Sequence, residues 1–125
     1  MSGKKAVVCD DDTTMQRIVQ RILEKQGFEV RAASNGQDGL GLVRAEKPNL
    51  LVLDLDMPVK GGLDVLRDLR REGGQGPYVI VLSNHEGREE QSQVKGLGAQ
   101  DVMIKPFNPA DFVTKIQGLV KGGLI

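Results

Sequence analysis

The sequence has no tryptophan, one cysteine and one histidine, and these absences exclude several classes of function. The single cysteine, Cys9, rules out an internal disulfide and any CxxC metal or redox motif. Lys and Arg together number 17, and Asp and Glu also number 17, so the net charge is zero. A chain without excess positive charge gives no support to a nucleic-acid-binding face. One tyrosine and three phenylalanines are too few for a base-stacking surface. No apolar run approaches the roughly 20 residues of a membrane span.

The composition is that of a globular protein, with 39% hydrophobic and 27% charged residues. Its 125 residues suit one ordinary domain. The first five residues are followed by only four apolar residues before three aspartates, so we expect no signal peptide. We therefore expect a soluble cytoplasmic protein that makes no membrane contact and does not bind nucleic acid directly.

Five short apolar segments recur at nearly even spacing and predict strands at 6–9, 28–32, 50–53, 78–82 and 102–104. Their apolar residues are continuous rather than alternating, which is typical of strands covered on both faces. The segments between them have helical spacing. Five strand–helix units in one chain predict a doubly wound α/β fold, with a parallel sheet and helices on both of its faces.

The helix after the first strand is the most clearly indicated, and we predict a capping box with Thr13 as its N-cap and Gln16 at N3. The last helix is expected to begin at Asn108 and Pro109. The helices near 36–46 and 88–98 are less clearly indicated. The first contains three glycines, and the second offers few apolar residues.

In a doubly wound sheet the ligand site lies beyond the carboxyl ends of the strands. Four of the five predicted strands are followed there by residues suited to phosphate or metal chemistry. They are Asp10, Asp11 and Asp12; Asp54 and Asp56; Ser83, Asn84 and His85; and Lys105. Acidic groups brought this close repel one another and raise their pKa values unless a cation intervenes. An all-oxygen set favours Mg²⁺, and a nearby lysine and serine suit a phosphoryl group.

The segments 7–15, 53–58, 81–83 and 104–107 resemble, in order and spacing, the receiver domain of two-component response regulators. The resemblance extends over about 5–121 and implies a single receiver domain, 1–125, with the flavodoxin-like strand order 2-1-3-4-5. It implies that Asp54 accepts a phosphoryl group from a kinase phosphohistidine. It also implies that Lys105, before a cis peptide bond, pairs with a phosphoryl oxygen, and that Ser83 donates a hydrogen bond to the phosphoryl group as the switch.

The same resemblance implies a Mg²⁺ (or Mn²⁺) site. Its expected ligands are Asp11, Asp54, Asp56 through its backbone carbonyl, and Asp10 through water. Three positions depart from the family pattern. Val102 replaces a common aromatic switch residue, and Asn84 replaces a small residue and narrows access to the acceptor. The third, Lys60-Gly61-Gly62, replaces a commoner Met-Asp-Gly in the loop after Asp54. We expect Asp56 and His85 to set the rate of dephosphorylation by orienting or blocking the attacking water.

The resemblance implies a sensor histidine kinase or a phosphotransfer protein as the phosphodonor. It implies an unknown output protein, or an effector domain missing from this chain, as the recipient of the signal. A homodimer would use the fourth helix, fifth strand and fifth helix, roughly 88–121. Such a receiver is not a turnover enzyme on small substrates.

Three other functions compete with this interpretation. Asp54 and Asp56 also resemble the DxD motif of haloacid-dehalogenase-type phosphatases, but no acidic pair follows Lys105. A flavodoxin-like electron carrier would need flavin-stacking aromatics. A degenerate receiver that acts as a phosphorylation-independent interaction module stays open, with Val102 and Asn84 in its favour.

Overall fold

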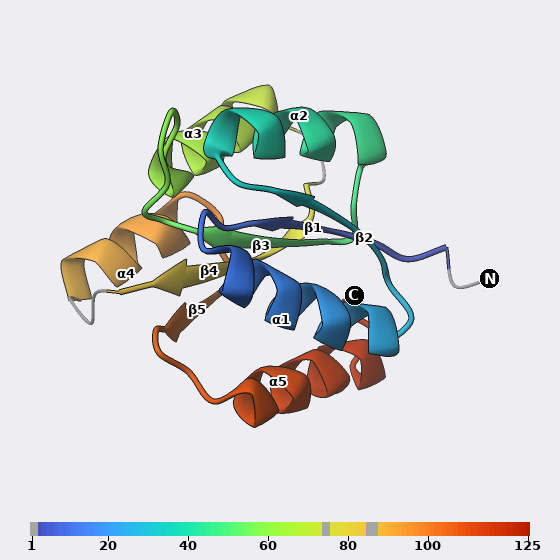
Figure 1. The fold of residues 1–125 in the computed structure, drawn as a ribbon. Coiled ribbons are helices and arrows are strands. Elements are labelled where there is room, and N and C mark those ends of the chain that lie inside the picture. The colour runs from blue at the N-terminus through green and yellow to red at the C-terminus, as the bar shows by residue number, and fades with distance from the viewer. Residues whose placement is uncertain (1–2, 74–75, 85–87) are drawn as a thin grey trace.

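A sheet of five parallel strands forms the middle layer of the molecule, and helices cover both of its faces (Figure 1). The computed structural model describes 3–73, 76–84 and 88–125, without the side chains of 88 and 89. The strands are β1 (Lys5–Cys9), β2 (Glu29–Ala33), β3 (Leu50–Asp54), β4 (Tyr78–Ser83) and β5 (Asp101–Ile104). The helices are α1 (Thr13–Lys25), α2 (Gly36–Glu46), α3 (Gly62–Glu72), α4 (Arg88–Gly96) and α5 (Pro109–Lys121). The strand order β2-β1-β3-β4-β5 confirms the predicted topology.

The central strands β1 and β3 are buried on both sides because two separate hydrophobic layers enclose the sheet. Val7 and Cys9 face one layer, together with buried residues of α2, α3 and α4. Ala6 and Val8 face the other layer, together with buried residues of α1 and α5. This arrangement explains the continuous apolar runs in the sequence, since neither face of these strands meets water.

The start of α1 differs from the sequence prediction. Asp12, not Thr13, is the N-cap, and its Oδ1 accepts the backbone N–H groups of Thr14 at 3.0 Å and Met15 at 3.2 Å. The predicted capping box of Thr13 and Gln16 is therefore wrong by one residue. An ionised aspartate satisfies the free N–H groups and also complements the positive end of the helix dipole, which a threonine hydroxyl does not.

Two glycines in α2 allow this helix to lie close to its neighbours. A Cβ added to Gly39 would lie 2.2 Å from the Sγ of Cys9, and one added to Gly36 would lie 2.1 Å from the backbone oxygen of Lys60. Both glycines are buried. The residues that made this helix less clear in the sequence are thus required by its packing against β1 and the β3–α3 loop.

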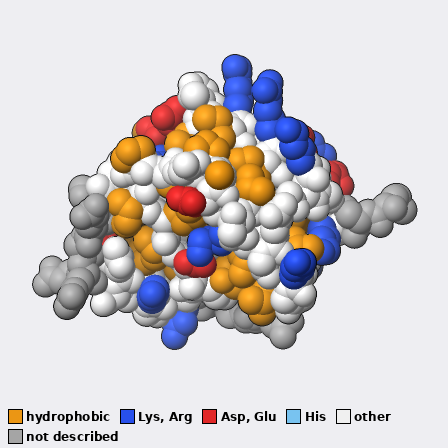
Figure 2. All heavy atoms as spheres, turned by 90° about the horizontal axis from the view of Figure 1, so that it is seen from below, with side chains coloured by type: hydrophobic (Ala, Val, Ile, Leu, Met, Phe, Trp, Pro, Cys, Tyr) orange, Lys and Arg blue, Asp and Glu red, His pale blue; other side chains and the backbone are white. Residues whose placement is uncertain are grey.

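The face formed by α1 and α5 carries hydrophobic side chains that are separated by charged ones (Figure 2). The start of α5 is as predicted, with Asn108 as N-cap accepting the N–H of Ala110 at 2.9 Å.

Across the described part of the chain, no helix has both the length and the apolar character needed to cross a membrane.

Candidate functional site

Three aspartates meet where β1 and β3 end, at the carboxyl edge of the sheet. Asp10 and Asp11 follow β1, and Asp54 is the last residue of β3. One carboxylate oxygen from each of the three lies within 4.8 Å of the others. Asp10 and Asp54 are buried, with exposed fractions of 0% and 2%, whereas Asp11 is exposed. The predicted clustering of these acids is confirmed.

Lys105 brings a positive charge from the end of β5 into this acidic cluster. A cis peptide bond joins it to Pro106, as the resemblance implied. Its Nζ lies 3.0 Å from Oδ2 of Asp10 and 3.5 Å from Oδ2 of Asp54. One ammonium group therefore faces both buried carboxylates and offsets part of their repulsion.

The acidic cluster perturbs the pKa values of its members. Burial raises the pKa of Asp54 to about 6, with a further contribution from the negative charge of Asp10. Lys105 and a backbone hydrogen bond from Asp56 oppose this rise. Burial lowers the pKa of Lys105, but Asp10 and Asp54 outweigh burial and raise it overall. Lys105 thus stays charged, and Asp54 is a carboxylate whose ionised form is poorly stabilised without further positive charge.

Backbone and side-chain hydrogen bonds fix the turn that carries Asp10. Its Oδ1 accepts the N–H of Asp12 at 3.0 Å. The Nε2 of Gln16 donates to the backbone oxygen of Asp10 at 2.9 Å and to that of Ala33 at 3.0 Å. Gln16 therefore ties the first turn of α1 to the ends of β1 and β2. The sequence pattern indicated only a capping role for Gln16, so this second role was not predicted.

Ser83 ends β4 beside the acidic cluster and is almost fully buried. Its Oγ donates a hydrogen bond to Oε1 of Glu90 in α4, at 2.8 Å. The next residue, Asn84, is exposed and donates from Nδ2 to Oδ2 of Asp56 at 3.3 Å. This contact joins the β4–α4 and β3–α3 loops. Glu90 was not among the predicted site residues, and no sequence motif marks it.

A family model described as the response regulator receiver domain matches residues 6–117. The chain belongs to this receiver family. It is 33% identical over 121 residues to the alkaline phosphatase synthesis transcriptional regulatory protein PhoP of Bacillus subtilis, covering 95% of this chain and 49% of that protein. The chain thus spans about half the length of the curated relatives it matches.

Solved receiver domains have the same fold. The receiver domain of the Francisella response regulator 1452 is 26% identical, with a TM-score of 0.85 and coverage of 96% of this chain and 98% of that one. The BeF3-activated receiver domain of DrrB is also 26% identical, with a TM-score of 0.82 and coverage of 94% and 97%. The chain is thus a receiver domain of two-component signalling, a phosphoacceptor rather than a turnover enzyme.

The residues at the carboxyl edge of this receiver fit a hard divalent cation. The donor set consists of carboxylate oxygens from Asp10, Asp11 and Asp54, the ligand type that Mg²⁺ prefers. Among the residues that the structure describes, two buried carboxylates face one ammonium group, so a cation would relieve a repulsion that the fold leaves in place.

Val102 and Cys9 belong to a hydrophobic layer rather than to the acidic cluster. Val102 is half-buried and packs against the hydrophobic layer of α2, α3 and α4, so it cannot act as an aromatic switch. His85 lies outside the described residues. Cys9 is fully buried, and burial raises the pKa of its thiol to about 12, which fits a core residue rather than a nucleophile.

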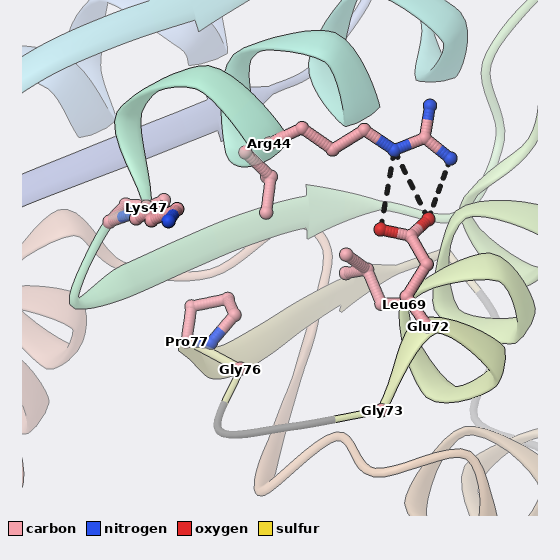
Figure 3. A pocket seen from close by; sticks show the side chains of 9 residues that line it. Arg44, Lys47, Leu69, Glu72, Gly73, Gly76 and Pro77 are labelled. Carbon is pink, nitrogen blue, oxygen red and sulfur yellow. Dashed lines mark hydrogen bonds and ion pairs between the residues drawn. The ribbon is translucent and has the colours of Figure 1, made fainter.

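A separate hollow of about 380 Å³ lies at the opposite edge of the sheet, before the amino ends of β3 and β4 (Figure 3). Arg44 and Glu72 bridge its mouth through an ion pair of 2.6 Å between α2 and α3. Lys47, Pro48 and Pro77 complete much of its wall. None of its lining residues belongs to the acidic cluster, so the hollow takes no part in the phosphoryl site.

Proposed function

We propose that Asp54 is the residue that accepts the phosphoryl group. Both oxygens of Asp10 are already engaged, by the N–H of Asp12 at 3.0 Å and by Lys105 at 3.0 Å. The contacts of Asp54 are longer. Its Oδ1 lies 3.4 Å from the backbone nitrogen of Asp56, and its Oδ2 lies 3.5 Å from Nζ of Lys105. The longer, weaker contacts of the Asp54 oxygens beside an ammonium group are the observation that carries this assignment.

The phosphoryl group would come from a phosphohistidine of a sensor histidine kinase or a phosphotransfer protein. An oxygen of Asp54 attacks the phosphorus, and the new O–P bond forms as the P–N bond to the imidazole breaks. The product adds about −1.5 to −2 charge to the site. Lys105 then pairs with a phosphoryl oxygen, and Ser83 donates a hydrogen bond to another.

The metal ligands proposed for Mg²⁺ or Mn²⁺ are Asp11, Asp54, the backbone carbonyl of Asp56, and Asp10 through water. When bound, the cation would neutralise the carboxylates and polarise the phosphoryl oxygens. Asp11 is suited to direct ligation because its carboxylate is exposed, and the ammonium group of Lys105 contacts Asp10 and Asp54 instead.

The test is incubation with acetyl phosphate and Mg²⁺, followed by intact-mass measurement. We expect a mass gain of one phosphoryl group that is absent in Asp54→Asn and strongly reduced in Asp11→Asn or in a chelator. Asp64→Asn is the matched control, because Asp64 is an exposed aspartate on α3 that contacts Arg67. An unchanged mass in the wild-type protein would instead support a phosphorylation-independent interaction module.

The output is proposed to act through the surface of α4, β5 and α5, toward an output protein, an effector domain or a second copy of the chain. The curated relatives are about twice as long as this chain, and PhoP is a transcriptional regulator, which supports an effector domain as the recipient. We also propose that the receiver domain lies in the cytoplasm. Light scattering with and without beryllium trifluoride tests the homodimer, which predicts a doubled mass only in its presence.

A further inference from the structure

The hydroxyl of Ser83 is held at rest by a carboxylate that lies outside the acidic cluster. Its Oγ donates to Oε1 of Glu90 at 2.8 Å, from the end of β4 to the first turns of α4. A serine hydroxyl has one proton, and an ionised carboxylate can only accept hydrogen bonds. Hydrogen bonds to charged groups are also stronger than those between neutral groups. In the structure, the hydroxyl of Ser83 thus donates to a charged acceptor, Glu90.

A phosphoryl group on Asp54 would need the same proton. Its oxygens are acceptors, so in the proposed function Ser83 must donate to them. The backbone of Ser83 is fixed, since its carbonyl oxygen accepts the N–H of Lys105 at 2.7 Å. Phosphoryl recognition therefore requires the hydroxyl of Ser83 to turn away from Glu90, and the two acceptors compete.

We infer that Glu90 is a positioning residue that holds Ser83 in the resting arrangement and competes with the phosphoryl group for its hydroxyl. This inference rests on the proposed function of Asp54 and Ser83. Glu90 also lines a hollow of about 250 Å³ with Asp64 and Arg67 of α3. The guanidinium of Arg67 lies 3.2 Å from Asp64.

The experiment is a titration with beryllium trifluoride and Mg²⁺, followed by amide NMR because the protein has no tryptophan. Glu90→Ala removes the competing acceptor, so we expect beryllium trifluoride to bind about fivefold to tenfold more tightly. Glu90→Gln keeps an acceptor oxygen without the charge and should give a smaller gain. In a Ser83→Ala background, Glu90→Ala should change the affinity less than about twofold, because a double-mutant cycle isolates the contact between the two residues.

Asp64→Asn is the matched control, since Asp64 lines the same hollow and loses the same charge, but its carboxylate contacts Arg67 rather than Ser83. Its affinity should stay at the wild-type value. Unchanged or weaker binding in Glu90→Ala, an equal gain in Asp64→Asn, or an undiminished gain without Ser83 would each overturn the inference. Failure of the wild-type protein to bind would overturn the proposed function as well. Glu90→Gln provides the same comparison with little change in side-chain shape, so the test does not depend on the folding of Glu90→Ala.

Discussion

Replacing Asp54 with asparagine is expected to stabilise the folded protein near neutral pH, although it removes the proposed phosphoacceptor. Burial, with the charge of Asp10, raises the pKa of Asp54 from 3.8 to about 6. A carboxyl group with a raised pKa binds its proton more tightly in the folded state than in the unfolded chain. The contribution of Asp54 to the free energy of unfolding is therefore most favourable below pH 3.8. It is lost as the pH rises through about 6.

The ionised carboxylate of Asp54 lowers the free energy of unfolding by about 3 kcal/mol above this pH range. Asparagine has nearly the same shape and cannot ionise, so it removes this penalty. The attraction of Lys105, at 3.5 Å, is lost too, but the pKa of Asp54 already includes it. For a chain of this size the gain corresponds to a rise in Tm of about 10 °C.

Thermal unfolding followed by far-ultraviolet circular dichroism measures this effect in a chelating buffer. The Tm difference between Asp54→Asn and the wild-type protein should be small near pH 4 and reach its full size near pH 7. Asp64→Asn, which changes an exposed carboxylate outside the acidic cluster, should show no such growth. A destabilised Asp54→Asn protein at neutral pH, or a Tm difference independent of pH, would refute the reasoning.

Four further changes test the site and the packing beneath it. Lys105→Met leaves Asp10 and Asp54 without their ammonium partner. It should lower the free energy of unfolding by about 3 kcal/mol in a chelator, as measured by urea denaturation. The control Lys115→Met breaks a more exposed ion pair and should lower the free energy of unfolding by less than about 1 kcal/mol. Gly39→Ala should lower the free energy of unfolding by about 1–3 kcal/mol because its Cβ meets the Sγ of Cys9. Cys9→Ala in the same chain should restore part of this stability. Additive losses in the double variant would contradict the packing. Asn84→Ala removes the 3.3 Å contact with Asp56 and should speed phosphorylation by acetyl phosphate about threefold; an unchanged rate would show that this contact does not limit access. Replacing Asp56 and His85 together should change the lifetime of the aspartyl phosphate, and an equal lifetime would exclude them as its determinants.

The sheet and the acidic cluster could be predicted because each depends on a strong local pattern. Strands buried on both faces need continuous apolar runs, and parallel strands bring the residues after them to one edge. Asp10, Asp11 and Asp54 therefore meet whatever the loops do in detail. The cis bond after Lys105 followed from the family resemblance and not from a physical pattern in the chain.

The features that could not be predicted depend on competition between neighbours or on close packing. Asp12 and Thr13 are both good N-caps, and only the structure shows that the chain turns into the helix after Asp12. Gly36 and Gly39 weaken a helix by propensity, and their packing role appears only when the elements they approach are known.

The resting site suggests that activation exchanges hydrogen-bond and ion-pair partners rather than filling empty positions. Lys105 is bound to Asp10 and Ser83 to Glu90, so both groups proposed to bind the phosphoryl group already contact a carboxylate. The free energy gained on phosphorylation is the difference between two sets of charge-assisted contacts, not the full value of the new set. A small difference keeps both arrangements accessible, and this is what a reversible signal requires.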